Sequence, residues 1–196
     1  MVAVSDKELI EMFKKGEEKA FEEIVRRYQK KVYNTIYRIL GNPEDANDLA
    51  QEVFIRVYRK LHLFQGKASF STWLFTITSN LCRDELRKRQ RRLKIRSLSE
   101  PIRYKDGEIE QEILDESMTP ERISINRELR DEIQAVIDKL PDEQKEAIVL
   151  REFQGFSYEE IAEIVGVALG TVKSRISRAR RNIREELSNL RSSVSS

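Results

Sequence analysis

The sequence has few of the residues that build metal centres, disulfides or membrane spans. Cys82 and His62 each occur once in a chain of 196 residues. A single cysteine cannot form a disulfide within the chain, and one cysteine with one histidine supplies too few ligands for a structural zinc site. No run approaches the roughly 18 consecutive apolar residues of a membrane span, and the first residues lack the apolar core of an export signal. We therefore expect a cytoplasmic protein without metal, cofactor or membrane insertion.

Glycine and proline are also scarce, with 7 and 4 residues, whereas 36% of the residues are charged and 39% are hydrophobic. This composition is too apolar for a disordered chain and too polar for one large core. The apolar residues recur at steps of three and four, which predicts helices, and the alternation typical of strands is nearly absent. The expected fold class is all-α, built from small helical units.

Capping residues divide the chain into helices. Ser5 and Glu8 form a capping box that opens a short helix closed near Gly16. A long amphipathic helix follows and stops at Gly41, and Asn42 and Pro43 open a third helix. After a loop at residues 64–71, a fourth helix runs into the basic segment 87–92. The second half is expected to hold a helix from Thr119 and Pro120 to Pro141, a helix at 142–153, and a helix opened by the capping box of Ser157 and Glu160.

Charge changes sign along the chain although the net charge is only +2. Residues 83–96 hold 8 basic and 2 acidic residues, residues 97–121 hold 2 basic and 8 acidic ones, and residues 171–196 hold 7 basic and 2 acidic ones. Helical periodicity fades in the acidic stretch, which indicates a flexible linker. We predict two helical domains, at 1–92 and 119–196, joined by an acidic linker at 93–118. A single basic run is most often a solvated face, but two such runs favour nucleic-acid binding.

The second domain carries a helix-turn-helix pattern. Ala162 lies four residues before Gly166, and Val172 follows six residues later. The small side chain lets two helices approach, glycine permits the turn, and valine packs the second helix onto the first. Acidic residues are absent from 171–184, so the second helix is suited to a DNA major groove. The alternative is an ordinary helical hairpin with a basic face.

The fourth helix of the first domain carries a different stripe. Aromatic, amide and cationic residues recur there at steps of three and four: Trp73, Thr76, Asn80, Arg83 and Arg87. Such groups suit unstacked bases and a single-stranded backbone. The preceding loop at 64–71 is small, polar and edged by aromatics, as a pocket for one flipped base would be. Trp73 alone is more often a core anchor than a base platform.

The order of these parts resembles the extracytoplasmic-function sigma factors of the bacterial RNA polymerase sigma factor family. The matching stretches are 45–58, 70–81, 140–144, 157–162 and 170–180, which span most of the chain except the linker and both termini. The resemblance implies that one domain binds the minus-ten promoter element and the clamp of core RNA polymerase. It implies that the other domain binds the minus-thirty-five element and the polymerase flap, and that an anti-sigma factor holds the protein inactive.

The resemblance also implies roles for individual residues. The polymerase contact falls on Asp48, Gln51, Glu52 and Ile55, although these could be a solvated helix face. The minus-ten DNA contact falls on the loop and the fourth helix: Phe64, Lys67, Ser69, Phe70, Trp73, Thr76, Asn80, Arg83 and Arg87. The minus-thirty-five contact falls on Thr171, Lys173, Ser174, Arg175, Ser177, Arg178 and Arg181. Ser177 is short where a bulkier side chain could contact bases.

Two other functions remain open at this point. A stand-alone regulator would use only the duplex-binding domain and would leave Trp73 and Asn80 without a role. An enzyme acting on nucleic acid would have carboxylates such as Glu52 and Glu159, but no histidine, metal cluster or glycine-rich phosphate loop lies near them. We therefore expect no catalytic residues.

Overall fold

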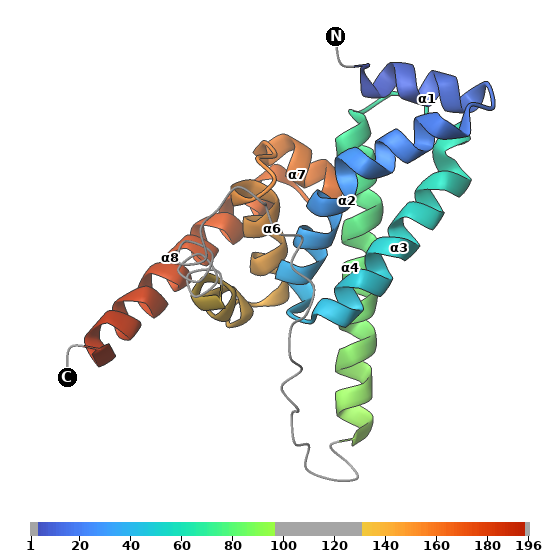
Figure 1. The fold of residues 1–196 in the computed structure, drawn as a ribbon. Helices are drawn as coiled ribbons and strands as arrows, with labels where there is room; N and C mark the ends of the chain where they lie inside the picture. Colours follow the sequence, from blue (N-terminus) through green and yellow to red (C-terminus); the bar gives the residue numbers. More distant parts are fainter. Residues whose placement is uncertain (1–3, 97–130, 195–196) are drawn as a thin grey trace, which may run out of the picture.

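The computed structural model describes residues 4–96 and 131–194, which are helices joined by short turns (Figure 1). Within these two ranges no strand occurs, which confirms the predicted all-α class. The elements are α1 (Asp6–Lys14), α2 (Glu18–Leu40), α3 (Pro43–Lys60), η1 (Leu61–Leu63), α4 (Phe70–Arg96), a helical stretch at 131–138, α6 (Asp142–Glu152), α7 (Tyr158–Val165) and α8 (Leu169–Val194).

The predicted capping residues set the ends of the first helices. The Ser5 hydroxyl accepts the Glu8 amide and the Glu8 carboxylate accepts the Ser5 amide, so the capping box of α1 is formed. Gly41 ends α2 in the left-handed conformation (φ 71°), where glycine carries no Cβ penalty. The Asn42 side chain then accepts the Asp45 amide, with Pro43 as the first residue of α3.

The loop before α4 is shorter than the sequence suggests. Ser69 accepts the Thr72 amide through its hydroxyl at 3.0 Å, and this cap lets the helix begin at Phe70 instead of after Ser71. At its other end α4 stays helical to Arg96, four residues beyond the predicted domain boundary at 92. The predicted linker beyond Arg96 and the predicted helix start at Thr119 and Pro120 lie outside the described residues.

The helix-turn-helix forms as predicted. Ser157 and Glu160 make a second capping box at the start of α7, and Gly166 ends this helix with φ 74°. Val172 is buried on α8 and Ala162 packs against the core from α7. The helix α8 begins at Leu169, two residues before the acid-free segment 171–184 that the sequence places on the second helix.

The two halves pack against each other in the structure. In the first half α2 contacts α1, α3 and α4, and in the second half α6 and α7 both contact α8. Contacts between α4 and α7 and between α2 and α6 join the halves, and the buried apolar residues form one continuous cluster. Six consecutive residues of α6, from Lys145 to Leu150, are buried, because this helix is surrounded by others.

The turn glycine offers a test of the helix-turn-helix geometry. Gly166→Ala would meet no atom within 4 Å, so its cost is the strain of an L residue at positive φ. We expect a loss of about 1 kcal/mol in the free energy of unfolding. Gly170→Ala is the matched control, because Gly170 lies in α8 with ordinary φ and equally open space and should be unchanged or slightly stabilised. Equal losses in urea titrations of both variants would contradict this role for Gly166.

Candidate nucleic-acid interfaces

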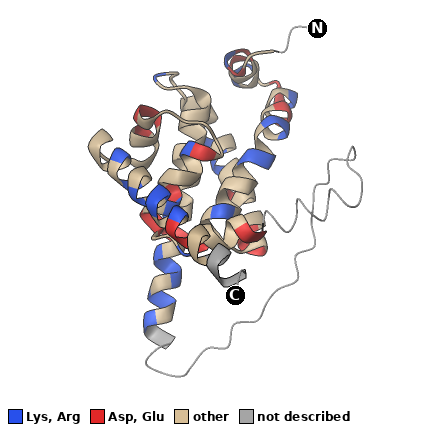
Figure 2. Ribbon diagram, turned by 90° about the vertical axis from the view of Figure 1, so that its left-hand side faces the viewer, with Lys and Arg blue, Asp and Glu red and all other residues tan. Residues whose placement is uncertain are grey.

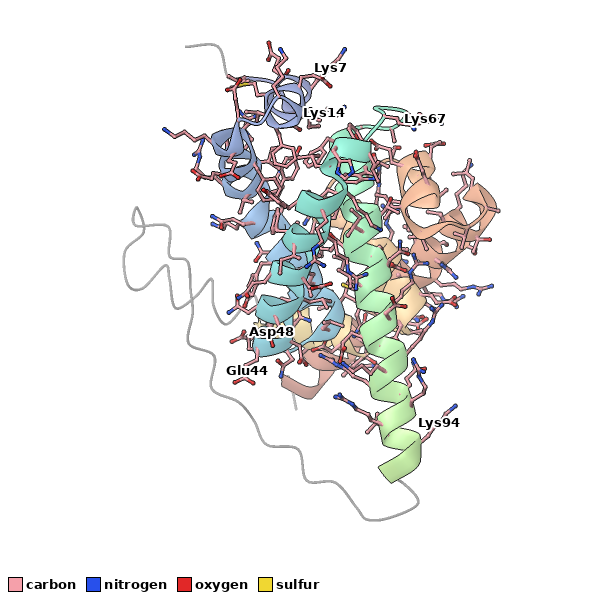
Figure 3. All side chains as sticks on the ribbon, turned by 90° about the vertical axis from the view of Figure 1, so that its right-hand side faces the viewer. Lys7, Lys14, Glu44, Asp48, Lys67 and Lys94 are labelled. Carbon is pink, nitrogen blue, oxygen red and sulfur yellow. The ribbon has the colours of Figure 1, made fainter. Side chains whose placement is uncertain are left out.

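One exposed face of α3 holds the four residues predicted to contact polymerase. Asp48, Gln51 and Ile55 are exposed and Glu52 is half-buried, in a spacing that keeps all four on one side of the helix. The opposite side is buried through Val53, Phe54 and Val57. Ile55 retains 45% of its surface although it is aliphatic, so the face combines one apolar side chain with polar neighbours. Figure 3 marks Asp48 on this helix.

The loop before α4 is built on a cluster of aromatic rings. The Phe64 and Trp73 centroids are 5.2 Å apart, and Phe70 lies 5.9 Å from both rings. Tyr28 of α2 packs edge-on against Phe70 at 5.4 Å. Phe70 is buried, so its position suits anchoring the loop, whereas Phe64 and Trp73 are half-buried. Trp73 is packed in this cluster but only partly buried, so it has features of both a core anchor and a base platform.

The polar residues in this loop and at the start of α4 differ in the hydrogen bonds that their side chains make. Lys67 is exposed, and Figure 3 places it at the opposite end of α4 from Lys94. Ser69 is exposed, but its hydroxyl also bonds those of Ser71 and Thr72 at 2.9 and 2.8 Å. The Thr76 hydroxyl donates to the Thr72 carbonyl at 2.8 Å, within its own helix.

The middle and C-terminal end of α4 carry the cationic stripe. Asn80 and Arg87 are exposed, whereas Arg83 is half-buried and donates to the Asn80 side chain at 2.6 Å. Figure 2 shows Lys and Arg following one another along the end of α4 that projects beyond the other helices. Arg89 is held against the other helices, because its guanidinium donates to the Leu40 carbonyl at 2.7 Å and to the Asp45 carboxylate.

The outer face of α8 holds the candidate duplex contacts. Lys173, Ser177, Arg178 and Arg181 are exposed there. A pocket of about 390 Å³ lies between α7 and α8 and is lined by Tyr158, Lys173, Ser177, Arg180, Arg181 and Arg184. Four of the six lining residues are Lys or Arg, all of them on α8, so the pocket is cationic and suits a phosphate backbone.

Three of the pocket residues were not predicted from the sequence. Arg180 and Arg184 lie at steps of three and seven from Ser177, a spacing that could have placed them beside the predicted residues. Arg180 also donates to Glu152 at 2.7 Å. Tyr158 comes from the preceding helix, and only the packing of α7 on α8 brings it to this pocket.

The remaining predicted residues of α8 are less accessible. Thr171 and Ser174 are half-buried and bonded to each other, with the Ser174 hydroxyl donating to the Thr171 carbonyl at 2.9 Å. Arg175 keeps only 16% of its side chain exposed and pairs with Glu143 of α6 at 2.8 Å. The position of Arg175 therefore suits holding α8 against α6.

In the described ranges, no helix is both long enough and apolar enough to cross a membrane, and no three metal-binding side chains gather. What the fold presents is a helix-turn-helix with a cationic outer face, a second cationic helix edged by aromatics, and an amphipathic patch on α3. These features are those of a helical DNA-binding protein with two separate cationic surfaces.

Comparisons with known proteins identify the family. Residues 24–92 match the model of Sigma-70 region 2, and residues 130–183 match that of Sigma-70, region 4. The chain is 38% identical over 192 residues to the ECF RNA polymerase sigma factor SigW of Bacillus subtilis, covering 94% of this chain and 97% of the relative. It is 38% identical over 182 residues to the ECF RNA polymerase sigma-E factor of Escherichia coli, covering 92% and 93%.

A solved structure agrees with this relationship. The sigma factor RpoE of Bartonella quintana, in complex with the anti-sigma factor NepR, has a TM-score of 0.67 and 28% identity, covering 87% of this chain and 98% of that one. The chain belongs to the family of extracytoplasmic-function RNA polymerase sigma factors. It is a transcription initiation factor that directs RNA polymerase to promoters.

Proposed function

We propose that the two cationic helices read two different states of one promoter. The exposed face of α8 contacts the paired minus-thirty-five element, with Lys173, Ser177, Arg178 and Arg181 at its centre. The loop at 64–69 and the stripe of α4 contact the opened minus-ten strand. The observation that carries this proposal is the pair of separate cationic surfaces: that of α4 adjoins a cluster of three aromatic rings, whereas that of α8 adjoins the single ring of Tyr158.

Polymerase supplies the link between the two surfaces. We assign its clamp contact to Asp48, Gln51, Glu52 and Ile55, and we treat residues 1–92 and 119–196 as the two domains that polymerase holds at a fixed separation. Once one domain is bound to its element, the effective concentration of the other at its own element rises. Capture of a flipped base then offsets an unstacking cost of a few kcal/mol, which makes opening depend on sequence.

Two further parts of the proposal concern regulation and compartment. The related RpoE was solved with an anti-sigma factor, which supports a similar inhibitor for this chain. A factor that works on polymerase and promoter DNA acts in the cytoplasm, and it acts by binding, without enzymatic activity of its own.

Run-off transcription with purified core polymerase and a promoter library tests the function directly. Unchanged start sites on addition of this chain would refute it.

Membership of the sigma factor family decides against the stand-alone regulator, whose distinguishing property would be duplex binding without polymerase. The cationic pocket on α8 would serve it equally well, because a helix-turn-helix can bind duplex DNA without polymerase. Gel shifts separate the two: a sigma factor should bind duplex promoter DNA tightly only with core polymerase present, whereas tight specific binding by the chain alone favours the regulator.

Asn80 provides a test of base reading. Its amide is exposed on α4 and can donate to and accept from a base edge. Asn80→Ala should reduce discrimination at one position of the opened element by about 1–3 kcal/mol, which corresponds to about 5- to 150-fold in promoter preference. Library transcription measures this preference, with Asn34→Ala as the control, since Asn34 is an exposed amide on α2. An equal loss for every base at every position would exclude a reading role.

A further inference from the structure

The short helix α1 lies beside the loop at 64–69 that precedes α4. The C-terminal end of α1 is packed through the Phe13 ring, whose centroid is 5.3 Å from that of Tyr58 on α3. The next residue, Lys14, donates through its ammonium group to the Phe64 carbonyl at 3.1 Å, across 50 positions of the chain. Figure 3 shows Lys14 and the loop residue Lys67 at the same end of the molecule. The packing of α1 therefore brings a cation to the first residue of the loop.

Phe64 is held at three points. Its amide donates to the Leu61 carbonyl at 3.1 Å, its ring centroid lies 5.2 Å from that of Trp73, and its carbonyl accepts from Lys14. The first two contacts come from η1 and α4, which border the loop on either side, whereas the third comes from α1. Fixing this carbonyl fixes the direction in which the chain leaves Phe64 toward the turn at Gly66, where φ is 69°. Lys14 therefore sets the orientation of the first peptide unit of the loop.

The first turn of α1 makes a second, indirect contact with the same aromatic cluster. The Tyr28 hydroxyl donates to the Asp6 carboxylate, and Arg27 donates to the same carboxylate at 3.2 Å. Burial raises the pKa of the Tyr28 hydroxyl and the Asp6 charge acts in the same direction, so this hydroxyl stays a protonated donor. The Tyr28 ring packs edge-on against Phe70 at 5.4 Å. The helix α1 thus reaches the cluster at Phe64 through Lys14 and at Phe70 through Tyr28.

We propose that α1 holds the base-capturing loop in its binding form, with Lys14 and Asp6 as positioning residues that act through the loop and not through contacts of their own to DNA. This inference rests on the proposed role of the loop at 64–69 in capturing a flipped base. A loop that is already in its binding form loses less conformational entropy when the base enters. The affinity of a loop that leaves this form falls in proportion to the fraction that remains competent. Lys14 therefore determines how tightly one base is captured without contacting that base.

Fluorescence of Trp73 in the free full-length chain tests the contact itself. Trp73 is the single tryptophan of the sequence and packs against Phe64, so its emission reports on the aromatic cluster. Lys14→Met should shift this emission to longer wavelength and increase its quenching by acrylamide, because a released Phe64 leaves Trp73 more open to water. Lys15→Met is the matched control, since it removes the same charge at the next exposed position and should leave the emission unchanged. Lys14→Arg keeps a cationic donor and should retain the wild-type spectrum.

Binding of a single strand to the holoenzyme tests the consequence for base capture. The probe is a labelled single strand of the minus-ten element, either intact or with an abasic sugar at the position where the promoter library shows the strongest base preference. Relative to Lys15→Met, Lys14→Met should weaken binding of the intact strand by about fivefold, because one charge-assisted hydrogen bond no longer holds the loop. Binding of the abasic strand should not change, because no base enters the loop. Lys14→Arg should bind both strands as the wild type does.

Tyr28→Phe tests the second contact. This variant removes the hydroxyl that donates to Asp6 and keeps the ring that packs against Phe70. Because Arg27 still holds Asp6, we expect changes in Trp73 emission and in intact-strand affinity that have the same direction as those of Lys14→Met but are smaller. Wild-type values for both measurements would refute the part assigned to Asp6.

Two results with Lys14→Met would overturn the proposal. The first is a Trp73 emission equal to that of Lys15→Met, which would show that Lys14 does not hold the cluster. The second is an equal loss of affinity for the intact and the abasic strand, which would show that Lys14 contacts the phosphate backbone directly. A wild-type holoenzyme that binds both strands equally would instead refute base capture by the loop, whereas Trp73 emission in the free chain would still decide whether Lys14 holds it.

Discussion

The double variant Lys173→Ala/Arg178→Ala should lose about 100-fold in affinity for duplex promoter DNA when assayed with core polymerase, since each cationic contact to a base edge contributes about 1–3 kcal/mol. Both side chains are exposed on α8 and lie near the two edges of its outer face. The buried stripe of Val172, Ile176 and Ala179 lies on the opposite side, so the fold should be unaffected.

Salt dependence shows whether these cations act on DNA. The slope of log affinity against log salt should become shallower by about 2, because each removed cation no longer displaces a counterion from the DNA. Arg26→Ala is the control, because Arg26 is an exposed cation on α2, far along the chain from α8 and paired with Glu23 at 2.7 Å. A variant that keeps the wild-type slope and affinity would remove Lys173 and Arg178 from the duplex interface.

Most helix ends could be predicted from the sequence because their determinants are local. Ser5, Asn42 and Ser157 each accept an amide three residues ahead, and Gly166 takes a positive φ that few other residues adopt. The starts of α4 and α8 are exceptions. Ser69 and Ser71 are both capable caps two residues apart, and the one chosen depends on how Phe70 packs into the aromatic cluster.

The exposed parts of the candidate interfaces were predictable for a similar reason. Helical spacing places Lys173, Ser177 and Arg181 on one face of α8 whatever that helix packs against. Arg175 was different, because its pairing with Glu143 depends on how α6 crosses α8. Spacing along one helix gives no information about a partner helix, which is also why Tyr158 was missed.

The contact between the halves has no local signal at all. In the sequence Glu146 is one polar residue beside an apolar run. Nothing in the neighbouring residues indicates that its carboxylate will accept a hydrogen bond from Ser79, 67 positions away in the chain. Its burial follows from α6 being enclosed on several sides. Contacts of this kind depend on tertiary packing, so no local pattern in the sequence predicts them.

Ile55→Glu should abolish most binding to core polymerase while leaving the fold intact. Ile55 is 45% exposed on α3, so a charged side chain there is solvated in the free protein. In a complex the same position becomes the apolar centre of the proposed clamp contact, where burying an unpaired charge is costly. Loss of an interface anchor typically costs 2 kcal/mol or more, which corresponds to roughly a 30-fold weaker affinity.

Leu63→Glu is the matched control for this variant. Leu63 is an aliphatic residue with 64% of its surface exposed, and it lies in η1, outside the proposed contact face. Competition against labelled wild-type protein for core polymerase measures both variants. We expect Leu63→Glu to compete like the wild type and Ile55→Glu to compete poorly. If both variants lose the same affinity for core polymerase, the polymerase recognises a general apolar surface that includes η1. The assignment of the clamp contact to one face of α3 is then wrong.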